Sequence, residues 1–168
     1  MTRYIKNTEK AIQRLIRYLE GKGYQVKLNG NDRPYSECDP QTRIITINED
    51  PGLHQLYILL HEAGHALIFG LDDYNEAFCE IKNQDWKLPE DKDNLYHYQV
   101  LKQEMLAWET GLNIASKLKI YVDANEYDKL ASNCYMSYCY RASQNHYQDA
   151  VKDILEQSGV TIKFNNCA

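Results

Sequence analysis

The sequence lacks the features that mark membrane, secreted and nucleic-acid-binding proteins. No apolar run approaches membrane-spanning length, and the first ten residues are polar and charged, so we expect neither a membrane segment nor a secretory signal. The 168 residues include 19 basic and 24 acidic side chains, and the resulting formal charge of -5 argues against nucleic acid as the main partner. These absences predict a cytoplasmic protein with no membrane association.

Cysteine is present but not in a pattern that organises a fold. The five cysteines are an odd number, are widely scattered, and include no Cys-x-x-Cys pair. The sequence therefore predicts neither a disulfide framework nor a cysteine-rich zinc knuckle. No linker-like stretch separates two apolar regions, so we expect residues 1–168 to form a single domain.

The hydrophobic pattern predicts an α+β fold, in which a small β-sheet packs on a mainly helical body. The expected elements are helices over 8–19, 51–69, 96–118, from 123 onward and over 143–157, with strands over 24–28 and 43–48. Residues 29–40 between the two strands are expected to form turns, and the polar segment 71–94 is expected to be mostly loop.

Two of the predicted helices have recognisable starting points. Asp50 precedes Pro51, which is a capping residue followed by the one helical position that suits proline. Asp123 and Glu126, three residues apart, have the spacing of a capping box. We therefore expect helices to begin at these two points.

The strongest chemical pattern is His61-Glu62-Ala63-Gly64-His65, inside the predicted helix over 51–69. Two histidines four residues apart on a helix point within about 40° of each other, so both imidazoles reach one ion. The carboxylate of Glu62 lies beside that ion, where it accepts a proton from a water molecule that the metal makes acidic. The pattern predicts His61 and His65 as ligands of Zn2+ and Glu62 as the general base.

Gly64 is unexpected in a helix interior, where glycine costs roughly 1 kcal/mol relative to alanine. We interpret it as a position that another backbone, or the surroundings of the metal, approaches closely. A long apolar run also surrounds the motif. Two histidines that occur on a helix by chance need no such surroundings, so the run favours a metal site.

A catalytic zinc takes a third protein ligand, and the candidates are Glu104 and Glu109 in the predicted helix over 96–118. Their separation of five residues turns a helix by about 140°, so one of them at most faces the metal. The face of Glu104 continues through small residues, which would let this helix pack against the glycine of the motif. Those small residues are Ala107, Gly111 and Ala115. We prefer Glu104 as the ligand and keep Glu109 as the alternative.

Amide hydrolysis also requires a donor that stabilises the developing oxyanion, usually a His, Tyr or Arg side chain. Tyr96, His97 and Tyr98 lie one to two helical turns before the preferred third ligand, and His54 lies seven residues before the first motif histidine. His97 is our first choice as the second catalytic residue.

Three features in this order resemble the ImmA/IrrE-type zinc metallopeptidases of bacteria and their mobile elements, over about residues 42–115. They are the strand over 43–48, the helix with His61-Glu62-Ala63-Gly64-His65-Ala66-Leu67, and the later Glu104-x-x-Ala107. The resemblance implies a zincin-like domain with the motif on a central helix. In such a domain His61, His65 and Glu104 bind zinc and Glu62 is the base. It also implies a peptide or protein substrate.

The leading functional prediction is a zinc-dependent metallopeptidase that hydrolyses peptide bonds with a zinc-bound water activated by Glu62. A second hypothesis is a non-catalytic zinc-binding interaction or regulatory protein of a phage or mobile element. A third keeps the hydrolytic chemistry but directs it at other amides or esters. The first two differ in coordination, because an enzyme keeps an open position whereas a structural zinc is closed by a fourth protein ligand.

Overall fold

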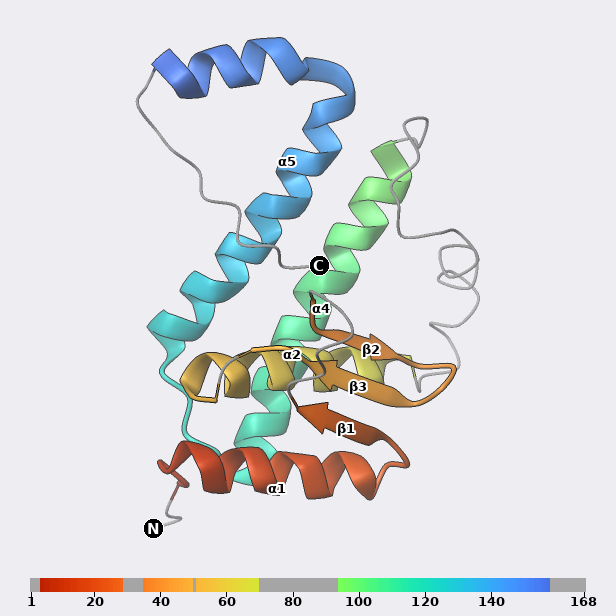
Figure 1. The fold of residues 1–168 in the computed structure, drawn as a ribbon, viewed down its shortest axis with the longest axis vertical. Helices are drawn as coiled ribbons and strands as arrows, with labels where there is room; N and C mark the ends of the chain where they lie inside the picture. Colours follow the sequence, from red (N-terminus) through yellow and green to blue (C-terminus); the bar gives the residue numbers. More distant parts are fainter. Residues whose placement is uncertain (1–3, 29–34, 50, 70–93, 158–168) are drawn as a thin grey trace.

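The computed structural model describes residues 4–28, 35–49, 51–69 and 94–157. Within 94–157 it describes side chains only for residues 99–140. These residues form an α+β fold that is mainly helical, as predicted, with four helices and a three-stranded mixed sheet (Figure 1). The helices are α1 (Thr8–Glu20), α2 (Leu53–Ile68), α4 (Asn94–Leu118) and α5 (Ala124–Gln157), and the strands are β1 (Gln25–Leu28), β2 (Glu37–Asp39) and β3 (Ile44–Ile47).

The sheet has the strand order β1-β3-β2, so the central strand is the last of the three in the sequence. β1 runs parallel to β3, with Gln25 opposite Ile44, whereas β2 runs antiparallel to it. The prediction of turns over 29–40 is wrong for Glu37–Asp39, which form β2. Three residues with two carboxylates carry no alternating pattern, and the strand forms because its backbone pairs with β3.

The helix that carries the motif begins later than its sequence suggests. α2 starts at Leu53, and its N-cap is Gly52, whose φ of 152° is a conformation that favours glycine. Pro51 therefore belongs to the turn before the helix and is not its first residue. The predicted cap, Asp50, lies outside the described residues. The carbonyl oxygen of Gly52 accepts the first helical N–H, that of Leu56, at 3.2 Å.

α5 is one continuous helix, whereas the hydrophobic pattern predicts two, the second beginning near residue 143. No glycine or proline occurs between Ala124 and Gln157. The helix therefore continues where the apolar period changes, because nothing in the backbone chemistry stops it. Figure 1 shows α5 changing direction toward its C-terminal end instead of breaking.

The start of α5 is tied to α2 through its cap. The carboxylate oxygen Oδ1 of Asp123 accepts the backbone N–H groups of Asn125 at 3.1 Å and Glu126 at 3.3 Å, as the predicted cap requires. The N–H of Asp123 itself donates to the hydroxyl oxygen of Tyr57 at 3.1 Å. A tyrosine of α2 thus takes the place of the reciprocal carboxylate of a capping box.

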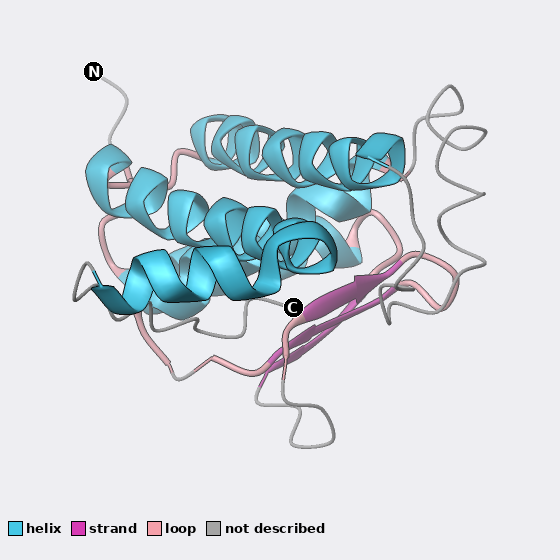
Figure 2. Cartoon of the chain, turned by 90° about the horizontal axis from the view of Figure 1, so that it is seen from above, coloured by secondary structure: helices cyan, strands magenta, loops and turns pink. Residues whose placement is uncertain are grey.

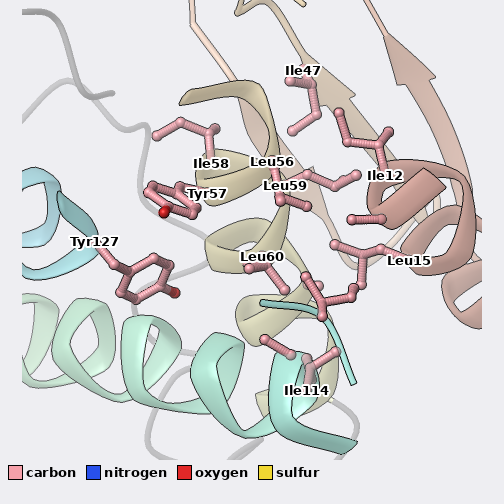
Figure 3. Close-up of a cluster of buried hydrophobic side chains, with 14 of the residues drawn as sticks. Ile12, Leu15, Ile47, Leu56, Tyr57, Ile58, Leu59, Leu60, Ile114 and Tyr127 are labelled. Atoms are coloured by element: carbon pink, nitrogen blue, oxygen red, sulfur yellow. The ribbon is translucent and has the colours of Figure 1, made fainter. Parts of the chain in front are cut away.

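One side of α2 packs on the sheet and α1 to form the apolar core (Figure 3). Figure 2 shows the sheet at one side of the molecule, with the helices gathered beside it. The side chains of Leu59, Leu15 and Ile47 are fully buried there and come from α2, α1 and β3, respectively. None of the described helices combines the length and the apolar character needed to cross a bilayer.

The opposite side of α2 crosses α4 at glycines. A Cβ atom on Gly64 would clash with the backbone carbonyl of Ala107, and one on Gly111 would lie 2.6 Å from the carbonyl oxygen of Leu60. Only residues without a side chain allow two helices to approach this closely. The close approach predicted from Gly64 and the small-residue face predicted for α4 are both confirmed.

Candidate metal centre

Three of the side chains predicted to bind metal lie together where α2 crosses α4. His61 and His65 are on successive turns of α2, Glu104 comes from α4, and their exposures are 7%, 8% and 4%. Nε2 of His61 lies 3.2 Å from Nε2 of His65 and 3.2 Å from Oε2 of Glu104. Nε2 of His65 lies 3.4 Å from Oε1 of Glu104. This buried group can hold a metal ion.

The glycine contact explains why these residues meet. Gly64 lies between the two histidines, and it touches Ala107, which follows Glu104 by three residues on the same face of α4. The crossing therefore sets Glu104 opposite the histidines. Of the two candidates for a third ligand, the structure brings Glu104 to them and leaves Glu109 exposed.

The three groups form a strongly coupled charge cluster. Burial alone would raise the pKa of Glu104, but His65 and His61 hold it well below the usual range of a carboxyl group. Burial alone would lower the pKa of His65, but the Glu104 carboxylate raises it above the ordinary histidine value. In the absence of a bound cation, the site is thus held by charge-assisted hydrogen bonds between histidine and carboxylate.

Glu62, the predicted general base, lies in the same buried region and is 6% exposed. Burial raises its pKa above the usual carboxyl value, the two ligand histidines oppose that shift, and the carboxylates of Glu104 and Glu37 add to it. The raised pKa of this largely buried carboxyl group makes it a stronger base than an exposed glutamate, which suits a group that accepts protons.

Aromatic rings surround the first ligand. The indole of Trp108 stacks on the imidazole of His61, with ring centroids 4.4 Å apart and planes at 22°. The ring of His65 meets that imidazole at its edge, with centroids 4.6 Å apart. The sequence pattern did not predict a role for Trp108 at the metal site. Its spacing of four residues from Glu104 places it on the same face of α4, but the stacking on His61 depends on how α4 packs on α2.

The outer nitrogen of each motif histidine is unsatisfied. Nδ1 of His61 and Nδ1 of His65 are buried and have no hydrogen-bond partner in the part of the chain that the structure describes. Because the Nε2 atoms face Glu104 and each other, a neutral, ligating ring carries its proton on Nδ1. Leaving a buried donor without an acceptor costs about 1–3 kcal/mol, so this arrangement is not one that stability alone favours.

The oxyanion-stabilising residue stays a prediction. His97 lies in the first turn of α4. The side chains of His97, Tyr96 and Tyr98 are outside the part of the chain that the structure describes. His54, the other histidine considered, is 50% exposed and its Nδ1 lies 3.1 Å from a carboxylate oxygen of Glu49. It therefore pairs with a surface carboxylate and does not join the three-residue cluster.

Comparison with known proteins identifies no family. No family model, no curated protein and no solved structure matches the chain.

Proposed function

We propose that this protein is a zinc-dependent metallopeptidase in which His61, His65 and Glu104 hold the metal and Glu62 is the general base. The spacing of the donor atoms carries the proposal. Tetrahedral zinc with ligand distances of about 2.0–2.1 Å sets its ligand atoms about 3.3–3.4 Å apart. The two Nε2 atoms are 3.2 Å apart, that of His61 lies 3.2 Å from Oε2 of Glu104, and that of His65 lies 3.4 Å from Oε1 of the same carboxylate. Two imidazoles and one carboxylate are also a common ligand set of catalytic zinc.

The charge of the site supports a divalent cation. Glu62 and Glu104 place two carboxylates in one buried region, and the histidines are neutral when they act as ligands. Two buried negative charges without compensation are strongly unfavourable. A zinc ion supplies the two positive charges that balance them.

The residues of the chain have distinct roles in the proposed hydrolysis. Zinc, when bound, supplies the Lewis acidity that lowers the pKa of a water molecule to about 7 and polarises the substrate carbonyl. Glu62 accepts the proton of the attacking water and delivers it to the leaving amine. The raised pKa of Glu62 keeps it a stronger base than an exposed glutamate.

Two observations favour a catalytic site over a structural one. Structural zinc is closed by four protein ligands, and the cluster found among the described residues has three. Glu62 is buried beside that cluster and its pKa is raised, as a general base requires. A structural zinc site needs no such base. The choice of peptide bonds over other amides or esters rests on the resemblance to ImmA/IrrE-type peptidases.

The direct test is cleavage of a broad peptide library by the zinc-loaded protein and by Glu62→Gln, with Glu109→Gln as the matched control. We expect Glu62→Gln to bind zinc normally but to cleave about 10²–10⁴-fold more slowly. Glu109→Gln removes an exposed carboxylate from the same region and should keep full activity. A zinc-loaded wild type that cleaves no peptide would overturn the peptidase assignment and favour the interaction protein.

A further inference from the structure

The orientation of the first ligand histidine needs an explanation. Ligating histidines commonly donate their second ring N–H to a carboxylate, a carbonyl or a water, and that hydrogen bond fixes the ring. Nδ1 of His61 has no such partner among the described residues. Rotation about the bond between Cβ and the ring is soft, and the contact of Nε2 with Glu104 restrains only one edge of the ring.

Stacking supplies that restraint. Trp108 is 2% exposed and His61 is 7% exposed, and their rings lie nearly parallel with centroids 4.4 Å apart. Turning the imidazole out of this plane would drive its edge into the indole. The neighbouring ring of His65, at 76° to the imidazole, restricts the same rotation.

The indole is itself held in place from the other helices. The ring of Tyr127 on α5 meets Trp108 edge-on, with centroids 5.0 Å apart, and its hydroxyl donates to the Trp108 carbonyl at 3.0 Å. Tyr57 of α2 packs against Tyr127 in turn, with centroids 5.2 Å apart. A column of rings from three helices therefore ends on His61.

We infer that Trp108 is a positioning residue, whose stacked ring holds the His61 imidazole in its metal-binding orientation in place of the usual second hydrogen bond. This inference rests on the proposed metal site. One turn of α4 then contributes both a ligand, Glu104, and the ring that orients another ligand. The geometry of the site is set by the packing of α4 on α2.

The test measures zinc affinity by competition with a chromophoric chelator, for wild type, Trp108→Leu, Trp108→Phe and Tyr127→Leu. Trp108→Leu removes the stacked ring and should weaken zinc binding by about tenfold or more, the usual effect of losing a group that orients a ligand. Trp108→Phe keeps a flat ring over the imidazole and should restore most of the affinity. Tyr127→Leu removes a ring that supports the indole but does not itself stack on His61, so it should weaken zinc binding less than Trp108→Leu does.

The possible failures are distinguishable. If wild type binds no zinc, the proposed function fails and this inference fails with it. If wild type binds zinc but Trp108→Leu binds it equally well, or Trp108→Phe binds it as weakly as Trp108→Leu, stacking does not position the ligand and the proposed function stands. Trp108→Met fills more of the indole volume without a ring, and it replaces Trp108→Leu in the same comparison if that variant does not fold.

Discussion

The two sides of α2 are both buried but are built from different chemistry. The side that faces α1 and the sheet is apolar, with Leu56 and Leu59 packed among other aliphatic side chains (Figure 3). The side that faces α4 carries His61, His65 and the glycine between them. The first side gains stability from the apolar area it removes from water, whereas the second buries polar groups at a cost.

This difference separates what holds the fold from what performs its chemistry. Apolar packing tolerates exchange among side chains of similar volume. The α4-facing side tolerates little, because Gly64 admits no side chain and the histidine nitrogens must meet one carboxylate. Substitutions on the apolar side should therefore lower mainly the free energy of unfolding, whereas substitutions of the histidines should lower mainly zinc binding.

The largest effect is expected from Gly64→Ala, which places a methyl group against the backbone of Ala107. Because the obstacle is backbone, the two helices must move apart, at a cost of about 3 kcal/mol or more in the free energy of unfolding. Denaturant unfolding measures this loss. Gly21→Ala is the control, since its Cβ would lie 3.4 Å from the nearest carbonyl oxygens and its φ is -63°. Similar stabilities for the two variants would show that the helices do not cross at Gly64.

Leu59→Ala tests the apolar side of α2. The side chain is fully buried, and its truncation should cost about 2–5 kcal/mol of unfolding free energy. Folded Leu59→Ala should keep its zinc binding, whereas His65→Ala, on the side facing α4, removes a ligand and should abolish it. Chemical unfolding and zinc titration of both variants give the comparison. A loss of zinc binding in folded Leu59→Ala as severe as in His65→Ala would contradict the division into two sides.

Zinc binding should release protons near pH 6.5. Although burial acts to lower the pKa of His65, Glu104 raises it above the ordinary value of 6.5. At pH 6.5 the metal-free protein should therefore carry a proton on the His65 ring, and zinc must displace it. Below the raised pKa, the affinity for zinc should increase by about tenfold for each unit that the pH rises, because one proton is released. Above that pKa the affinity should level off. Calorimetry in buffers of different ionisation enthalpy counts the protons, and none released at pH 6.5 would refute the coupling.

The smallest effect is expected where α2 supports the start of α5. Tyr57→Phe removes the hydroxyl that accepts the N–H of Asp123, and the free energy of unfolding should fall by about 1 kcal/mol. Thermal unfolding is sensitive enough to detect it. Tyr121→Phe changes a 46% exposed tyrosine and should have almost no effect. Equal shifts in the two variants would mean that this hydrogen bond adds nothing to stability.

Much of the α2–α4 contact could be predicted from the sequence because its determinants are local. A glycine inside an apolar helix and small residues spaced by four on another helix each predict a close approach. The face shared by Glu104 and Ala107 then separates Glu104 from Glu109. These patterns depend on helix geometry alone, so they can be recognised without knowledge of the tertiary structure.

The features that sequence reasoning missed depend on contacts between distant segments. β2 exists because Glu37–Asp39 pair with β3, and the start of α2 depends on the backbone conformation of Gly52. The role inferred for Trp108 depends on rings contributed by three helices. None of these is encoded in a local hydrophobic period, which explains why the sequence pattern did not predict them.

The proposed function depends above all on zinc binding by His61, His65 and Glu104. The most direct test is the zinc stoichiometry and affinity of wild type, Glu104→Gln and Glu109→Gln after expression in zinc-replete medium. We expect one zinc per chain in wild type and in Glu109→Gln, and zinc binding weakened by at least about tenfold in Glu104→Gln. A wild-type protein without zinc, or equal affinity in the two glutamate variants, would contradict it.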